Sequence, residues 1–475
     1  MLNLYIEISK YLILILMALY TFCNFRYFTA AEAEDKEEYC MWQQKILLLL
    51  HFIAFSVLFF KTEEVKILYF YGMQLLFFLL YPFVLRHIYP NISSLLLNNV
   101  CLFLVLGFIM LTRLSQAYAM RQFVIVAAGA LLTLPVPWIM DRVWGIPGWR
   151  WLYMGAGLLL LLAVFLVGTT SYGAKMTLSF GGISLQPAEF VKLTFVFFAA
   201  SMLSESLEFK NICLTSALCA LHVVILIASR DLGTALIFFV TYIVILYIAT
   251  GRTVYVTLGA CAFAAAGALA YRLFSHVRTR VAAWRDPWAD ITSGGYQIAN
   301  SLFAIGTGGF AGTGLMQGMP DRIPIVEKDF IFAAISEELG AVTAICLILI
   351  CLGCFLQMIL TALYMDVLFY KLLAAGLGTL YLMQVFLTIG GVTKFIPSTG
   401  VTLPFVSYGG SSVLGSFLLF MVIQGMHVIM LNDADADGET EDEYPDDAYE
   451  DDYEDYDDYD DDDTDPDAYR KYDGV

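Results

Sequence analysis

One acidic residue in this sequence stands where a carboxylate can do chemistry. Asp329 directly precedes an apolar run that begins near Phe330, so it lies where a membrane helix starts at the water boundary. A helix N-terminus stabilises an anion, and a carboxylate held there can take a proton from a substrate hydroxyl as a general base. The alternative is structural, because Asp is also a favoured N-cap residue. Two acids deeper in the same run, Glu337 and Glu338, need polar partners inside a bundle.

Arginines stand upstream of Asp329 in the same polar segment. Arg278 and Arg280 occur in the stretch RTRVAAWRDPW (278–288), with Arg285 nearby. A guanidinium group matches phosphate oxygens two at a time, so this cluster predicts binding of a diphosphate. Contacts with lipid headgroups at the membrane surface are the alternative. The glycines of residues 295–314 could bring backbone N–H groups close to the same anion.

Two opposite charges stand at the start of another apolar run. Glu189 and Lys192, in QPAEFVK (186–192), are three residues apart, so they share one helix face and each can neutralise the other. A charge inside the bilayer is costly, which makes such residues functional by default. They either contact a substrate or tie helices together as an ion pair. Asp231, in RDLGT, is predicted to cap the helix that follows it.

The elements that must hold these residues are membrane helices. The 475 residues are 59% hydrophobic and only 15% charged, which excludes a water-soluble fold. Backbone groups in lipid must bond internally, and the alternation of a barrel strand is absent, so we predict an all-α polytopic membrane protein. Hydropathy predicts about thirteen spans, at 11–28, 46–60, 67–85, 95–112, 122–140, 151–168, 187–203, 212–228, 232–249, 254–273, 331–360, 368–390 and 411–431.

Three segments and one tail interrupt this pattern. We expect a short polar linker at 29–45, one long polar loop at 274–330, and a proline- and glycine-rich connection at 391–412. The net charge of −18 is set by residues 433–475, which hold 23 of the 44 acids and two of the 26 bases. That tail has a balance of −21 and leaves +3 for the membrane body. The tail is predicted to be disordered, because it cannot bury a core. A docking segment for a basic partner is the alternative.

Four stretches together resemble the SEDS family (FtsW, RodA, SpoVE). They are QPAEFVK at 186–192, DLGT at 231–234, DFIFAAISEELG at 329–340 and PSTGVTLPFVSYGGSS at 397–412. The resemblance implies a ten-helix core at 91–432, preceded by an extension of about three transmembrane helices at 1–90 and followed by the tail at 433–475. It also implies a glycosyltransferase that polymerises lipid II into peptidoglycan strands outside the cytoplasmic membrane, for division, elongation or sporulation.

Position by position, Asp329 matches the family's essential loop aspartate, and Glu189 and Lys192 match its buried charged pair. The sequence departs from the family pattern where Ile325 and Lys328 replace the usual residues before Asp329, and where Arg230 replaces a proline before Asp231. Lys328 is expected to lower the pKa of Asp329.

The resulting hypothesis gives each residue a role. Asp329 takes the proton from the acceptor sugar, or holds a divalent cation such as Mg²⁺ or Mn²⁺, and Arg278 and Arg280 hold the leaving diphosphate. Glu189 and Lys192 are candidate substrate-binding residues. No nucleotide cofactor is needed, because the lipid diphosphate is itself the activated leaving group.

The expected partners are lipid II, polyprenyl-diphosphate-linked glycan, membrane lipids and a class B penicillin-binding protein, with no nucleic acid. The expected location is the cytoplasmic membrane with the acidic tail in the cytoplasm. The resemblance supports that orientation, whereas a count of positive charges favours the reverse. Two alternatives are a lipid II flippase and a non-catalytic scaffold for wall-synthesis enzymes.

Overall fold

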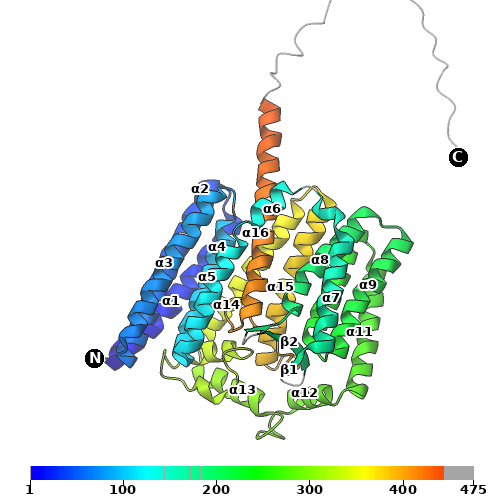
Figure 1. Ribbon diagram of the computed structural model, residues 1–475. Coiled ribbons are helices and arrows are strands. Elements are labelled where there is room, and N and C mark those ends of the chain that lie inside the picture. The colour runs from blue at the N-terminus through cyan, green and yellow to red at the C-terminus, as the bar shows by residue number, and fades with distance from the viewer. Residues whose placement is uncertain (1, 144, 172–173, 181–182, 443–475) are drawn as a thin grey trace, which may run out of the picture. The chain divides into compact units, whose positions relative to one another are not determined.

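The computed structural model describes residues 2–143, 145–171, 174–180 and 183–442, and it consists mainly of long helices (Figure 1). The first three are α1 (Leu2–Thr29), α2 (Ala33–Thr62) and α3 (Val65–Ile88). The long helices that follow are α4 (Ser94–Leu114), α5 (Gln116–Thr133), α7 (Arg150–Val167), α8 (Ala188–Glu205), α9 (Phe209–Ala228), α10 (Leu232–Thr250), α11 (Thr253–Leu273), α14 (Ile331–Leu363), α15 (Leu368–Val392) and α16 (Gly410–Asp442).

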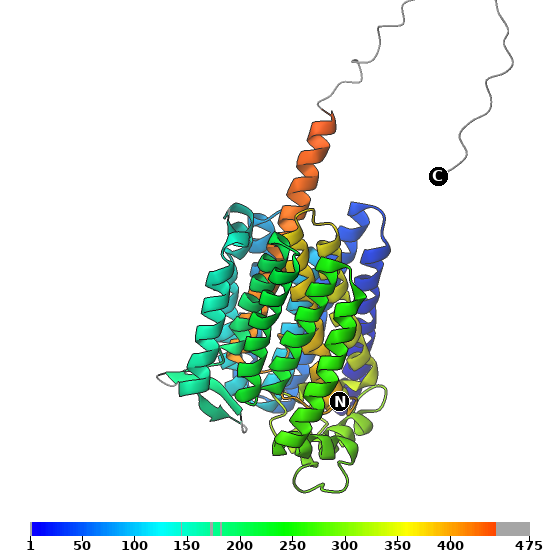
Figure 2. The same cartoon turned by 90° about the vertical axis from the view of Figure 1, so that its right-hand side faces the viewer.

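Shorter elements connect these helices. Next to the membrane spans lie the helices α6 (Val136–Arg142), η1 (Ile146–Gly148), α12 (Ser275–Arg285), α13 (Tyr296–Gly308) and η2 (Pro320–Arg322). The strands β1 (Thr169–Ser171), β2 (Ala174–Phe180) and β3 (Ile183–Leu185) form an antiparallel sheet in that order, in which Leu178 pairs with Leu185. The C-terminal end of α7 and the N-terminal end of α8 adjoin this sheet, at the end of the bundle that also carries α12 and α13 (Figures 1 and 2).

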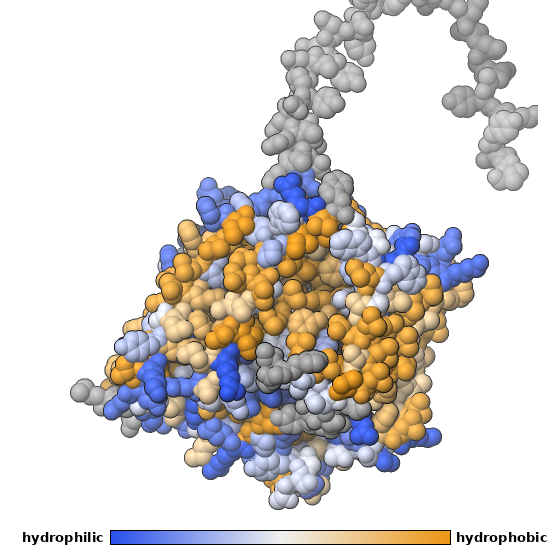
Figure 3. Space-filling model, viewed as in Figure 1, coloured by the Kyte–Doolittle hydropathy of each residue, from blue (hydrophilic) through white to orange (hydrophobic). Residues whose placement is uncertain are grey.

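The predicted all-α polytopic membrane fold is confirmed. Among the described residues, twelve helices are long and apolar enough to cross a membrane. Each of the thirteen predicted spans corresponds to a helix, and the thirteenth is α8, whose charged residues Glu189, Lys192 and Glu205 lower its hydropathy. α8 is largely buried inside the bundle, where α7, α10 and α15 contact it. Figure 3 shows the apolar surface that the bundle presents along its length, with polar residues gathered toward both ends.

One expectation was wrong, and one element was not predicted. The polar linker at 29–45 is mostly helix, because α2 begins at Ala33 and its charged residues are good helix formers. Glu34 and Asp35 also lie in its first turn, where acidic side chains are favoured. The small sheet of β1, β2 and β3 was not predicted. It lies beyond the ends of the membrane spans, where the backbone is not required to be helical.

The first three helices are held to the rest of the bundle by buried hydrogen bonds. Tyr20 donates to Oδ1 of Asn99 at 3.0 Å, and Nδ2 of Asn99 donates to Oδ1 of Asn24 at 2.8 Å. Between α3 and α4, Arg86 donates to Oδ1 of Asn98 at 3.0 Å. Hydrogen bonds between helices in an apolar environment fix their register. α1 to α3 therefore pack as an integral part of the membrane bundle.

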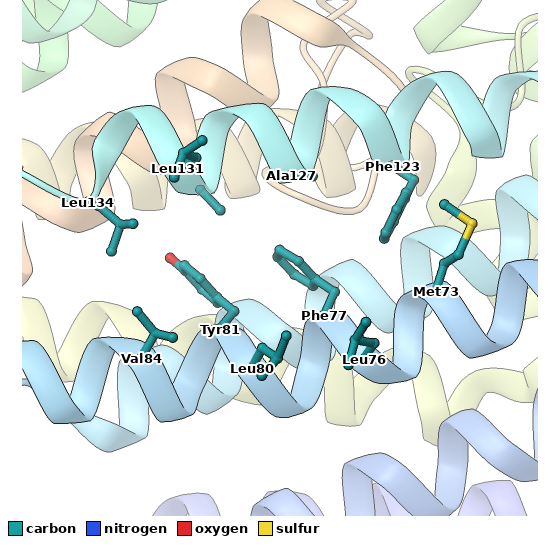
Figure 4. Close-up of a pocket in the computed structure, with 11 residues that line it drawn as sticks. Met73, Leu76, Phe77, Leu80, Tyr81, Val84, Phe123, Ala127, Leu131 and Leu134 are labelled. Carbon is teal, nitrogen blue, oxygen red and sulfur yellow. The ribbon is translucent and has the colours of Figure 1, made fainter.

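A groove of about 450 Å³ lies between α3 and α5 and faces outward (Figure 4). Its walls are apolar and aromatic, with Phe77 of α3 and Phe123 of α5 among the lining side chains. Tyr81 also lines it, and its hydroxyl group is directed to the sulfur of Met421. The groove offers contact to hydrocarbon and no charged group.

Contacts divide the chain into Met1–Asn432 and Asp433–Val475. Within the first unit, α6 and the sheet lie at opposite ends of the bundle (Figure 1). The prediction of a disordered tail concerns residues that lie mostly outside the described part of the chain.

Candidate active site

A cavity of about 200 Å³ lies at the end of the bundle formed by α12, α13 and the start of α14. The connection between α15 and α16 closes its remaining side. These segments are far apart in sequence, and long polar loops between membrane helices are where functional sites concentrate. The lining residues are Thr279, Arg280, Ala283, Gly294, Gln297, Ile298, Ile325, Asp329, Phe330, Ser398 and Gly400.

Asp329 lines this cavity and does not cap α14. The N-cap position is Phe330, which provides no side-chain cap. The Asp329 carboxylate forms no hydrogen bond with any residue that the structure describes. Capping was the structural alternative for this residue, and it is wrong. The carboxylate is half-buried and available to a ligand in the cavity.

The environment of Asp329 makes its carboxylate more basic than usual. Burial raises the pKa of Asp329 to about 6, although the charges of Lys328 and Arg280 act to lower it. The expected effect of Lys328 is therefore present in direction, but burial outweighs it. A carboxyl group that titrates near 6 is ionised at neutral pH and still accepts a proton readily, which suits a general base.

Arg280 and Asp329 approach each other across Gly400. A Cβ atom added to Gly400 would lie 3.4 Å from Oδ2 of Asp329 and 3.9 Å from Nη2 of Arg280. Gly400 has φ +76°, a conformation that other residues rarely adopt. Arg280 makes no hydrogen bond with the described residues, so its guanidinium group is free to bind an anion.

Arg278 lies elsewhere on the same helix. Two residues along an α-helix correspond to a rotation of about 200°, so Arg278 faces away from Arg280. It is exposed and does not line the cavity. The two arginines therefore do not converge on this cavity, and a substrate contact by Arg278 stays a prediction.

Three neutral polar residues of the cavity, Thr279, Gln297 and Ser398, were missed by the sequence reasoning. The Thr279 hydroxyl group is already bonded to the carbonyl of Ser275. Gln297 lies in the first turn of α13, and Ser398 lies in the connection before α16. Both segments contain glycine-rich motifs, but a single Gln or Ser in a polar loop does not by itself predict a functional site. Only the packing of four separate segments around one cavity identifies them.

Glu189 and Lys192 form a buried ion pair, with Nζ of Lys192 2.8 Å from Oε2 of Glu189. Nζ also donates to Oε1 of Gln384 at 3.0 Å, and Nε2 of Gln384 donates to the backbone carbonyl of Thr402 at 3.0 Å. The pair is thus linked to the connection that supplies Ser398 and Gly400. Neither residue lines the cavity, so their binding of substrate stays a prediction.

The prediction that Asp231 caps a helix is confirmed. Its Oδ1 accepts a hydrogen bond from the backbone N–H of Thr234 at 3.1 Å. Burial raises the pKa of Asp231, and the charges of Lys192 and Glu189 act on it as well. Asp231 also acts electrostatically on Arg280, so it lies within range of the charges of both the buried pair and the cavity.

Two of the departures from the family pattern coincide with unusual backbone. Arg230 has φ +65° and Ile325 has φ +59°. Proline cannot adopt a positive φ, so position 230 is incompatible here with the proline that the family usually has. Ile325 lines the cavity, and a β-branched residue in this region of backbone space is a strained exception.

The acids Glu337 and Glu338 have the expected polar partners, except that Oε2 of Glu337 is buried without a hydrogen bond to the described residues. Nε of Arg113 donates to Oε1 of Glu338 at 2.9 Å, and Oε1 of Glu337 accepts from the backbone N–H of Met319 at 2.8 Å. They hold the segment before η2 against α14. The glycines there serve the same packing: a Cβ at Gly308 would lie 2.1 Å from a backbone oxygen of α14. The glycines that do line the cavity are Gly294 and Gly400.

The residues around Asp329 do not by themselves form a metal cage. In the part of the chain that the structure describes, no group of three or more His, Cys, Asp or Glu residues is arranged to hold a metal ion. Mg²⁺ is commonly held by one or two carboxylates together with substrate phosphates. Asp329 fits that pattern only as one ligand of an ion that a bound phosphate also contacts.

Most of the membrane bundle is similar in sequence to known proteins. Residues 93–430 match the model of the FtsW/RodA/SpoVE family, described as a cell cycle protein. The chain is 39% identical over 267 residues to the peptidoglycan glycosyltransferase RodA of Mycobacterium leprae, a match that covers 53% of the chain and 57% of that relative. It is 33% identical over 310 residues to the stage V sporulation protein E of Bacillus subtilis, covering 63% and 84%. The chain thus spans less than two thirds of the length of the mycobacterial relative.

Solved structures agree in fold. One, described as a peptidoglycan synthase complex that coordinates polymerization and crosslinking, has a TM-score of 0.61 and 25% identity, covering 72% of the chain and 98% of the solved chain. The rod shape determining protein RodA of Thermus thermophilus has a TM-score of 0.52 and 23% identity, covering 71% and 96%.

Proposed function

The chain belongs to the FtsW/RodA/SpoVE family, and on that premise we propose that it is a peptidoglycan glycosyltransferase that polymerises lipid II into glycan strands. The observation that carries the proposal is the cavity in which Asp329 and Arg280 face each other across Gly400. A base and a cation held this close can serve the two ends of one glycosyl transfer.

The reaction uses the two groups in different roles. Asp329 accepts the proton of a hydroxyl group on the acceptor sugar, and the oxygen attacks C1 of the donor sugar. The bond between C1 and the diphosphate oxygen breaks, and the electron pair leaves with the lipid diphosphate. Arg280 stabilises the charge that develops on this leaving group. Alternatively, Asp329 would hold a divalent cation, which would lower the pKa of the acceptor hydroxyl group and neutralise charge on the diphosphate.

The membrane bundle supports the rest of the proposal. Apolar grooves such as the one between α3 and α5 can contact hydrocarbon chains (Figure 4). We expect the cytoplasmic membrane as the location, with the end that carries α6 toward the cytoplasm and the cavity toward the outside. A class B penicillin-binding protein is the expected partner, because the similar solved complex is described as joining polymerization to crosslinking.

The proposal is tested by Asp329→Asn in a lipid II polymerisation assay with purified protein. The amide keeps the shape of the side chain but cannot take a proton, so polymerisation should fall by about 10²–10⁴-fold. Glu327→Gln is a matched control, because Glu327 is a half-buried neighbour that does not line the cavity. Its charge raises the pKa of Asp329, so its removal leaves the base ionised at neutral pH. Wild-type activity in Asp329→Asn would remove the residue from the mechanism.

The same assay separates a polymerase from a flippase or a scaffold. Detergent removes the two compartments that transport requires, so a flippase would not lengthen glycan chains there. A scaffold would also leave lipid II unpolymerised, with or without Asp329.

A further inference from the structure

The polar side chains of the cavity fall into a charged set and a neutral set. Asp329 and Arg280 carry charge, whereas Thr279, Gln297 and Ser398 are neutral. The Thr279 hydroxyl group already donates to the carbonyl of Ser275 at 3.2 Å, which leaves Gln297 and Ser398 as the neutral groups open to a ligand. Neither Gln297 nor Ser398 makes a side-chain hydrogen bond with the residues that the structure describes. Both side chains are half-buried and neither has a polar atom that is fully buried without a partner, so a ligand that enters the cavity can bond to them.

Gln297 is held in place by the packing of α13. A Cβ added to Gly295, at the N-cap of the helix, would lie 2.2 Å from the carbonyl oxygen of Pro287, so only glycine permits this approach. Ile298 and Ala299 are buried, and the Ser301 hydroxyl group donates to the carbonyl of Val392 at 2.9 Å. The free amide of Gln297 therefore extends from a fixed helix.

Ser398 is positioned by close contact with the end of α15. A Cβ added to Gly391 would lie 3.1 Å from Cα of Ser398. Two residues further along, Gly400 separates Asp329 from Arg280. Ser398 is thus held in the same short segment that shapes the charged part of the cavity.

The size and chemistry of the cavity define what it can hold. Its volume of about 200 Å³ is below the roughly 300–1,000 Å³ of a complete small-molecule site, so it accommodates one part of a larger substrate. A diphosphate pairs best with Arg280, because guanidinium and phosphate attract by charge. An amide and a hydroxyl group instead match the hydroxyl and acetamido groups of a sugar, which are neutral donors and acceptors.

We propose that Gln297 and Ser398 bind the N-acetylated sugar ring that carries the attacking hydroxyl group, and that they hold this group at Asp329. The inference rests on the proposed function and assigns its acceptor subsite. Gln297 and Ser398 supply hydrogen bonds to the ring, while Asp329 supplies the base and Arg280 faces the diphosphate.

The test is a kinetic comparison of Gln297→Ala and Ser398→Ala with the wild-type protein. Each variant loses hydrogen bonds that position the sugar before the transition state, so the KM for lipid II should rise about tenfold, with kcat within about threefold. Binding of a plain polyprenyl diphosphate, which lacks the sugar, should stay within about twofold of wild type. Asn300→Ala is the matched control, because its amide lies on the same helix outside the cavity and donates to the carbonyl of Tyr296.

Each result bears on one proposal. A wild-type KM in both variants, or an equal loss of affinity for the plain polyprenyl diphosphate, would overturn the sugar subsite. So would a fall in kcat with unchanged KM. These results leave the glycosyltransferase proposal intact, provided that Asp329→Asn is inactive; full activity of Asp329→Asn would instead defeat that proposal. If Gln297→Ala does not fold, Ser398→Ala carries the same expectation.

Discussion

Two polar regions of this bundle lie close together and differ in how their hydrogen bonds are satisfied. Around Glu189 and Lys192, the charged groups bond to each other and to Gln384. In the cavity at Asp329, the side chains of Arg280, Gln297 and Ser398 make no hydrogen bonds with the described residues. Polar groups that already bond to each other are unavailable to a ligand, whereas the accessible polar groups of the cavity can bond to one.

The strongest test of this difference is to remove one partner of the Glu189–Lys192 ion pair. Lys192→Met leaves Glu189 buried beside an apolar side chain, and an unpaired buried charge costs about 3–5 kcal/mol. We expect a large loss of folded protein, measured as a lower thermal midpoint in detergent and a smaller monodisperse fraction by gel filtration.

The double variant Glu189→Gln with Lys192→Met provides the control. It removes both charges, so most of the stability should return. If stability returns and polymerisation returns with it, the pair is structural. Restored folding without polymerisation would support a direct role in binding substrate, as the sequence had allowed.

A substitution at Gly400 tests the cavity at Asp329. Gly400→Ala forces a side chain into positive φ and inserts a methyl group between Asp329 and Arg280. We expect polymerisation to fall about tenfold to a hundredfold, because small displacements of catalytic groups have effects of that size. Gly409→Ala, in the same motif but with no positive φ and no contact to the cavity, should retain most of its activity.

The dependence of the rate on pH reports on Asp329 itself. Burial raises the pKa of Asp329 to about 6, and the base must be deprotonated to accept a proton. The value of kcat/KM for lipid II should therefore be constant above this pH and fall as pH decreases through about 6, whereas an ordinary Asp would stay active to about pH 4. An acid limb near pH 4 would contradict the buried environment described for this carboxylate.

The charged part of the site and most of the fold could be predicted from the sequence. In a chain this apolar, Asp329, Arg280 and the Glu189–Lys192 pair are visible because charges are rare, and the long helices follow from hydropathy. The strands between α7 and α8 and the polar start of α2 could not be predicted, because hydropathy detects membrane spans and does not report the secondary structure of segments outside the membrane. Gln297 became visible only when tertiary packing brought its helix to the cavity.

The smallest expected effect separates the two arginines of α12. Arg280 lines the cavity and its charge lowers the pKa of Asp329, so Arg280→Gln should reduce kcat about tenfold or more and move the acid limb to higher pH. Arg278 is exposed on the other side of the helix and is not among the charges that act on Asp329. Arg278→Gln should change kcat by less than about threefold and leave the acid limb in place, with any loss removed by high salt, as for an exposed contact with lipid headgroups. An equal loss of kcat in the two variants would mean that both guanidinium groups grip the diphosphate, and that the substrate extends around α12 beyond the cavity.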